Sequence, residues 1–122
     1  MKIKAYYAHS KLIYGTRREI SERAFISRRY QVLCPNRDIG ERGSMEPYLQ
    51  AVASCQTVIV SEVDGYVGRG VFEEIKHALK IGHPVLALRA SARGFTLLSV
   101  RSVAVVDSQD WRYRFGKLQV AR

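Results

Sequence analysis

Residues 57–88, TVIVSEVDGYVGRGVFEEIKHALKIGHPVLAL, decide the fold of this chain. Thr57–Val60 is a continuous apolar run, which is typical of a strand buried on both faces of a parallel sheet. A glycine-rich loop follows at Asp64–Gly70, and Val71–Ile81 has the pattern of a helix that a glycine ends. Pro84–Leu88 predicts the next strand. The stretch therefore predicts a strand–helix–strand unit of a parallel sheet.

The N-terminal half continues the same alternation. Ile3–Ala8 predicts a first strand and Tyr30–Leu33 a second. Lys11–Arg29 predicts an amphipathic helix between them, or a shorter one capped by Thr16 with Glu19 three residues later. We further expect a polar loop at Asn36–Ser44, a helix at Met45–Ser54 capped by Ser44, a strand at Ser102–Val106, and an edge strand or interface segment in the tail at Trp111–Val120.

This order of elements predicts an α/β fold. We expect a single Rossmann-like domain over residues 1–122, with a parallel five-stranded sheet in the order 2-1-3-4-5 and helices on both faces. Ligands of such sheets bind outside the carboxyl ends of the strands where the strand order reverses, here strands 1 and 3. Those ends carry the polar segments Tyr6–Ser10 and Glu62–Gly70.

The composition of the chain is typical of a globular protein. The chain has 122 residues, of which 47% are hydrophobic and 25% charged, as in an ordinary globular domain. The sequence shows no signal peptide and no apolar run long enough to span a membrane, so we expect a cytoplasmic protein with no membrane partner. The net charge of +9 is compatible with nucleic acid, but the arginines are dispersed and no nucleic-acid-binding motif is present.

The two cysteines, Cys34 and Cys55, lie far apart in the sequence, without a CxxC motif or a cysteine–histidine cluster. We therefore predict no metal site and no cofactor, and expect both cysteines to be small buried or half-buried residues in a reducing compartment.

The glycine-rich loop is the strongest local signal for a ligand. Gly68 and Gly70 allow the backbone to approach a ligand closely, and the first amides of the following helix can donate to an anion. Arg69 would add a positive charge suited to phosphate. Alternatively, the loop serves only to turn the chain.

The same region contains two carboxylates that are candidates for catalysis. Glu74 is spaced three and four residues from Val71 and Ala78, which places it toward the buried side of the helix as a candidate nucleophile or general acid–base. Asp64 ends the third strand, and we expect it near Glu74, since paired carboxylates can cleave glycosidic bonds. Alternatively, Asp64 is a turn residue before Gly65.

The ends of strands 1 and 2 supply further candidates. We expect Tyr7 to hydrogen-bond the catalytic carboxylate or the ligand, with Tyr6 on the opposite face of the sheet. His9 is a candidate phosphate ligand or acid, or merely a turn residue, and Ser10 is a candidate phosphate ligand. Asn36 follows strand 2, where a ribose or base edge could sit, or it belongs to a plain turn.

These segments together resemble the nucleoside 2-deoxyribosyltransferase-like superfamily and are similar to the nucleotide-binding domains of cytokinin-activating phosphoribohydrolases. The resemblance covers about residues 1–90 and rests on YYAHS, MEPYLQAVASCQTVIVSE and VFEEIKHALKIGHPVLAL. It implies that Glu74 attacks the anomeric carbon with Asp64 and Tyr7 in support, although Val71 stands where the family has threonine. It also implies a homodimer or higher homo-oligomer.

The resulting hypothesis is an N-glycosidase or deoxyribosyltransferase-like protein that cleaves the N-glycosidic bond of a nucleoside monophosphate. One alternative is a non-catalytic binder of a nucleotide or ADP-ribose-derived signal in the same cleft. The other is a basic module associated with nucleic acid.

Overall fold

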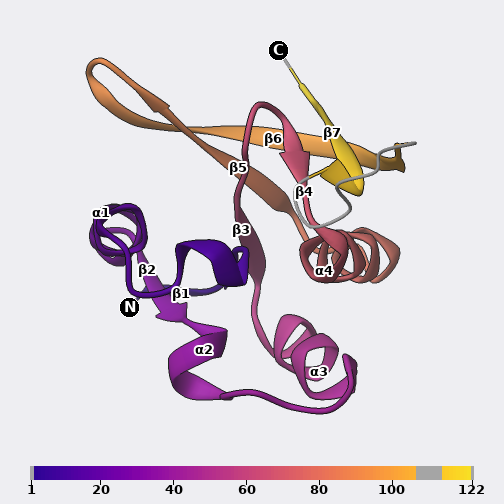
Figure 1. The fold of residues 1–122 in the computed structure, drawn as a ribbon. Coiled ribbons are helices and arrows are strands. Elements are labelled where there is room, and N and C mark those ends of the chain that lie inside the picture. Colours follow the sequence, from indigo (N-terminus) through magenta and orange to yellow (C-terminus); the bar gives the residue numbers. More distant parts are fainter. Residues whose placement is uncertain (1, 107–113, 122) are drawn as a thin grey trace.

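The computed structural model describes residues 2–106 and 114–121 and contains one mixed sheet with helices packed against it (Figure 1). The seven strands of the sheet lie in the order β2-β1-β3-β5-β6-β7-β4. The elements in chain order are β1 (Ile3–Ala8), the 3-10 turn η1 (Lys11–Ile13), α1 (Arg17–Ser27), β2 (Tyr30–Leu33), α2 (Pro35–Asp38), α3 (Glu46–Ser54), β3 (Thr57–Ser61), β4 (Tyr66–Val67), α4 (Arg69–Lys80), β5 (Val85–Ser91), β6 (Gly94–Val105) and β7 (Gly116–Val120).

The α/β class is confirmed, but the prediction of a five-stranded, all-parallel sheet is wrong. Strands β2, β1, β3 and β5 are mutually parallel, whereas β6 runs antiparallel to β5 and β7 antiparallel to β6. The reason lies after β5, where the chain turns back over Ala92 and Arg93 and enters β6 at Gly94, whose φ is 117°. Because a parallel neighbour needs a long crossover connection, this short turn imposes an antiparallel pair.

Helices cover both faces of the parallel part of the sheet (Figure 1). On one face, Ile26 of α1 packs in a cluster with Tyr7 of β1 and Ile59 of β3. Side chains alternate along a strand, so Tyr6, the neighbour of Tyr7 on β1, points to the other face of the sheet. Helices α3 and α4 pack over that face. Adjacent residues of β1 therefore face different helices.

Local sequence signals explain the helix boundaries. The Thr16 side chain accepts a hydrogen bond from the Glu19 amide and caps α1, so the shorter of the two predicted helices is the one that forms. Gly15, with φ 74°, separates α1 from η1. Helix α3 begins at Glu46, and its N-cap is Met45 rather than Ser44. The predicted polar loop begins with the single turn α2.

The glycine-rich loop contains a tight hairpin rather than an open ligand loop. Val63 and Tyr66 exchange two backbone hydrogen bonds of 3.0 and 2.9 Å across Asp64 and Gly65. Both turn residues have positive φ, 53° and 84°. Two-residue hairpin turns of this kind match the right-handed twist of the strands that they join. This turn leads into β4, which pairs with β7, so the tail does form a strand, but β4 and not β7 lies at the edge of the sheet. Trp111 lies outside the described residues.

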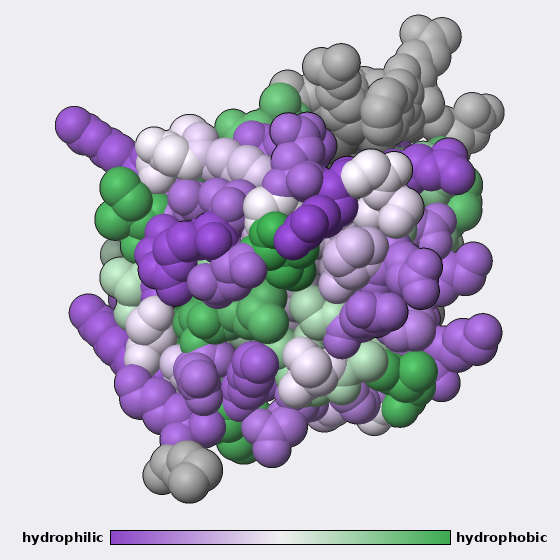
Figure 2. All heavy atoms as spheres, turned by 90° about the horizontal axis from the view of Figure 1, so that it is seen from below, coloured by the Kyte–Doolittle hydropathy of each residue, from purple (hydrophilic) through white to green (hydrophobic). Residues whose placement is uncertain are grey.

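In the part of the chain that the structure describes, no helix is both long and apolar enough to cross a membrane. Seen from the side of α2 and α3, most of the surface is hydrophilic, with smaller apolar areas between the polar side chains (Figure 2). Cys34 and Cys55 are buried and free, as the sequence predicted.

Candidate functional site

Two cavities open at the end of β3, and the smaller one also reaches the end of β1, so both lie at the edge of the sheet where the sequence placed the ligand. The smaller has a volume of about 300 Å³ and lies between η1 and the start of α4. The larger is an open groove of about 970 Å³ between α1 and the strands β5 and β7. Arg18 and Val63 line both cavities, so the two form neighbouring parts of one cleft.

The smaller cavity brings together two of the predicted ligand residues, Ser10 and Gly68. Gly68 is the N-cap of α4 and offers no side chain to its first amides, which have no acceptor within the helix. The Ser10 hydroxyl accepts a hydrogen bond from the Leu12 amide at 3.2 Å and keeps its own proton available for donation. This end of the cleft can therefore donate hydrogen bonds to an anion. Gly70 is exposed in the first turn of α4 and lines neither cavity.

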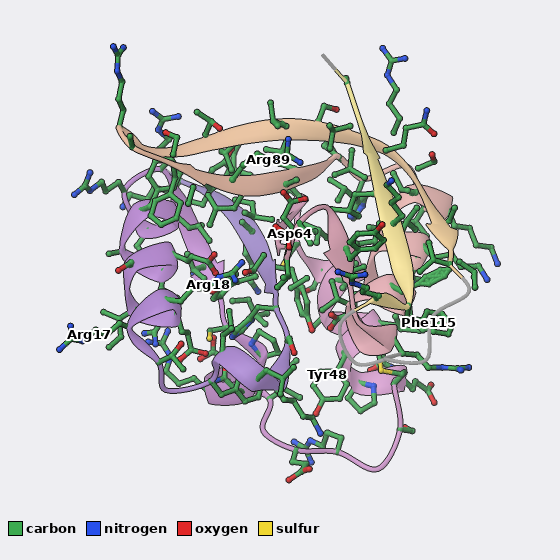
Figure 3. The ribbon with its side chains drawn as sticks, turned by 45° about the horizontal axis from the view of Figure 1, so that its top comes forward. Arg17, Arg18, Tyr48, Asp64, Arg89 and Phe115 are labelled. Carbon is green, nitrogen blue, oxygen red and sulfur yellow. The ribbon has the colours of Figure 1, made fainter. Side chains whose placement is uncertain are left out.

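Arg18, and not Arg69, places a positive charge at both cavities of the cleft. Its guanidinium donates to Glu22 Oε2 at 3.1 Å, to Ser61 Oγ at 3.1 Å, and to the Glu62 carbonyl. Figure 3 shows Arg18 pointing inward from α1, whereas Arg17 points away. Arg69 instead lies over the Phe115 ring, 4.9 Å from its centre, and lines neither cavity, so its predicted phosphate role is not supported.

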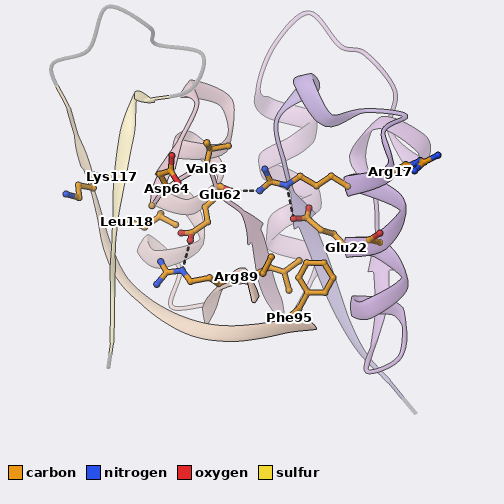
Figure 4. Close-up of a pocket in the computed structure, with 14 residues that line it drawn as sticks. Arg17, Glu22, Glu62, Val63, Asp64, Arg89, Phe95, Lys117 and Leu118 are labelled. Carbon is orange, nitrogen blue, oxygen red and sulfur yellow. Dashed lines mark hydrogen bonds and ion pairs between the residues drawn. The ribbon is translucent and has the colours of Figure 1, made fainter. Parts of the chain in front are cut away.

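The larger groove has a buried carboxylate in its wall (Figure 4). Glu62 Oε1 accepts a hydrogen bond from Arg89 Nε at 2.8 Å, while only 6% of the Glu62 side chain is exposed. Its second oxygen, Oε2, has no hydrogen-bond partner among the described residues. Asp64 also lines this groove, on the hairpin turn.

Glu74 lies on the buried face of α4, as its spacing predicted, with 6% of the residue exposed. The hydroxyl of Tyr6 donates to Glu74 Oε2. Burial raises the pKa of Glu74 to about 8, and the Tyr6 hydrogen bond opposes this rise without cancelling it. Glu74 itself lines neither cavity, but Val71, one turn before it on α4, lines the smaller one.

The tyrosine next to Glu74 was predicted wrongly. Tyr7 lies on the opposite face of the sheet, where its hydroxyl donates to Glu22 Oε1 at 2.5 Å. The alternation of β1 was read correctly, but the sequence does not show which face α4 covers. Tyr6 therefore takes the position that we had expected for Tyr7.

The expected pair of Asp64 and Glu74 does not form. Asp64 is exposed at the tip of the hairpin, and the pKa of Glu74 is raised by burial rather than by a neighbouring carboxylate. The positive φ of Asp64 supports the alternative reading, in which this residue serves the turn.

His9 and Asn36 lie in a buried hydrogen-bond network beside the cleft, not in it. His9 Nε2 lies 2.7 Å from Glu19 Oε2, and Asn36 Nδ2 donates to the same oxygen at 3.0 Å. Asn36 Oδ1 accepts from Cys34 Sγ at 2.8 Å. Burial favours a higher pKa for Glu19, but hydrogen bonds from His9 and Gly15 outweigh it and hold the pKa below its ordinary value. Because the His9 side chain is fully buried, it is not a phosphate ligand in this structure.

Sequence reasoning missed the acidic face of α1. Glu19, Glu22 and Ile26 are the buried residues of this helix. Their spacing of three and four residues was a usable signal, because it places both glutamates on the same helix face as a core isoleucine.

Comparisons of the chain with models of protein families, with curated proteins and with solved structures find no match. The fold and the cleft define an α/β protein with a polar site at the carboxyl ends of its parallel strands. The resemblance to deoxyribosyltransferase-like proteins stays a prediction.

Proposed function

We propose that the chain binds a nucleoside 5′-monophosphate in the cleft and cleaves its N-glycosidic bond with Glu74. The observation that carries the proposal is the buried pair of Tyr6 and Glu74, one helical turn from the Val71 wall of the cleft. A buried ionisable pair costs free energy unless it is well paired, and shifted carboxyl pKa values concentrate at functional sites.

In this proposal Glu74 reacts in its ionised form, which becomes the major form only above its pKa of about 8. The carboxylate forms a bond to the anomeric carbon as the bond from that carbon to the base nitrogen breaks. The electron pair of the broken bond goes to the base, which takes a proton from water and leaves hydroxide. Water or an acceptor hydroxyl then attacks the anomeric carbon, its proton goes to the hydroxide, and the bond between the sugar and Glu74 breaks, which restores the carboxylate. Tyr6 holds the carboxylate in place, since its hydroxyl already donates to Oε2.

The phosphate is assigned to the smaller cavity. Ser10, the uncapped start of α4 behind Gly68, and Arg18 provide hydrogen-bond donors and positive charge there. For the sugar to reach Glu74, the wall of this cavity must open. The single turn η1 is the part of the wall best suited to move, because none of its residues is buried.

A second candidate is binding without turnover. The observation that favours it is that Glu74 lines neither cavity, so a nucleotide could occupy the cleft without touching the carboxylate. In that case, Glu74 and Tyr6 form a structural pair beneath the binding site.

The test is a chromatographic assay of base release from a panel of nucleosides and 5′-monophosphates. Glu74→Gln is the informative variant because it keeps the size of the side chain and an oxygen acceptor for Tyr6. Glu73→Gln, a half-buried neighbour on the same helix, is the matched control. We expect release by the wild type and by Glu73→Gln, with at least a 100-fold loss in Glu74→Gln.

Equal release by Glu74→Gln would reject its role as nucleophile. No release by any variant, together with a nucleotide that raises the melting temperature, would favour binding without turnover. If no compound on the panel is cleaved and none stabilises the chain, both candidates fail. The predicted homodimer also remains to be tested, by the mass of the chain in solution.

A further inference from the structure

We propose that His9, Glu19 and Cys34 bind a zinc ion at a site separate from the cleft. One potential ligand atom from each of these residues lies within 4.8 Å of the other two, and all three residues are buried. They come from three places in the chain, after β1, in the first turn of α1 and after β2. No spacing rule for zinc sites applies to such a set, which is why the sequence predicted none.

The orientation of His9 is that of a metal ligand. Its Nδ1 lies 3.0 Å from the Tyr7 carbonyl oxygen, and since a carbonyl only accepts, Nδ1 carries a proton and donates it. Metal-binding histidines use the same hydrogen bond to fix the ring and aim the other nitrogen at the ion. The ring also stacks on Tyr7, with 3.8 Å between ring centres. Nε2 is thereby held toward Glu19 and Cys34.

The donor set fits zinc better than a hard cation. It combines an imidazole nitrogen, a carboxylate oxygen and a thiol sulfur, which are the ligand types of zinc sites. Calcium and magnesium prefer oxygen ligands alone. The amide oxygen of Asn36, which accepts from Cys34 Sγ at 2.8 Å, is available as a fourth donor.

Zinc would replace protons that the cluster now holds. His9 Nε2 and Glu19 Oε2 lie 2.7 Å apart, the length of a charge-assisted hydrogen bond, so one proton lies between the two atoms. Two ligands on a tetrahedral zinc ion, each about 2.0 Å from it, lie about 3.3 Å apart, so these atoms must separate by about 0.6 Å. On binding, the shared proton and the Cys34 thiol proton leave to solvent, and bonds from zinc to nitrogen, oxygen and sulfur form.

The site would be structural. The His9 side chain is 0% and the Glu19 side chain 5% exposed, so the ion would be shielded from water and substrate. It would tie the end of β1 to the start of α1 and the end of β2. Because such a site forms only in the folded chain, zinc should raise the melting temperature.

The experiment uses the full chain, purified without a metal-affinity tag and stripped with a chelator. Zinc is added to the folded chain and, because the site is buried, also during refolding. The informative variant is Cys34→Ala, and Cys55→Ala is its matched control because Cys55 is the other buried free cysteine. Bound zinc, the melting temperature and the sulfur-to-metal absorption band with cobalt are measured.

We expect one equivalent of zinc, a higher melting temperature and the cobalt band in the wild type and in Cys55→Ala, and none of these in Cys34→Ala. If Cys34→Ala does not fold, the same measurements are made on His9→Gln, with His77→Gln as its control. We then expect the loss of zinc binding in His9→Gln and not in His77→Gln. The proposal would be overturned if the wild type bound no stoichiometric zinc, whether zinc was added to the folded chain or during refolding. It would also be overturned if the Cys34 and His9 variants bound as much zinc as the wild type. Base release is not a readout here, so the proposed function can fail independently.

Discussion

At the scale of single residues, Tyr6 and Tyr7 show how one strand serves two polar networks. Both side chains are completely buried, and each hydroxyl donates to a glutamate on a different face of the sheet. Burial is the largest cause that raises the pKa of each phenol, so both stay protonated and act as donors. Of these two tyrosines, Tyr6 is the one that hydrogen-bonds Glu74.

Tyr6→Phe should affect Glu74 specifically. Removing the hydroxyl leaves a buried carboxyl group without its donor, so we expect a loss of about 1–3 kcal/mol in the free energy of unfolding. The pKa of Glu74 should rise further, because the Tyr6 hydrogen bond lowers it. Urea denaturation and an NMR titration of the Glu74 carboxyl carbon measure the two effects.

Tyr7→Phe is the control for this change. It should cost a similar amount of stability, since Glu22 loses a donor, but it should leave the pKa of Glu74 and base release unchanged. Equal effects of the two variants on the Glu74 titration would contradict the assignment of Tyr6.

At the scale of elements, two glycines differ in whether the surrounding structure leaves room for a side chain. Gly116 begins β7, where an added Cβ would lie 2.9 Å from Val103 Cγ2 and 3.3 Å from the Phe72 ring. Gly70 lies in the first turn of α4, where an added Cβ would have no atom within 4 Å beyond its chain neighbours and the backbone of its own helix.

Gly116→Ala should therefore weaken the contact between β7, β6 and α4. We expect a loss of about 1–3 kcal/mol in the free energy of unfolding, because a β-branched valine and a ring cannot both yield easily. Gly70→Ala should leave stability unchanged or raise it by up to about 1 kcal/mol, through better helix propensity. Thermal denaturation of both variants checks this, and a stable Gly116→Ala would contradict the packing of β7.

At the scale of the whole molecule, Glu74 makes global stability depend on pH. The pKa of its carboxyl group is raised from 4.5 to about 8 in the folded chain, so folding favours the protonated form. The resulting stabilisation is fully present below about pH 4.5 and is lost as the pH rises toward 8.

Between about pH 5 and pH 7 the wild type should lose roughly 2–3 kcal/mol of unfolding free energy relative to Glu74→Gln, which cannot ionise. Denaturant unfolding of both proteins at several pH values measures this difference. Parallel pH profiles would show that Glu74 is already ionised, or hydrated, in the folded chain.

Much of the architecture could be predicted from residue patterns. The apolar run at Thr57–Val60 indicated a central strand, Thr16 and Glu19 indicated the start of α1, and the spacing around Glu74 indicated its burial. These features depend on short-range periodicity and capping, which the sequence displays directly.

Only the tertiary structure decided which side chains meet. It placed Tyr6 rather than Tyr7 on Glu74, Arg18 rather than Arg69 in the cleft, and His9 beside Cys34. Each of these contacts joins segments from different parts of the chain. Such contacts depend on which face of the sheet each helix covers, and the periodicity of a single strand or helix does not show this.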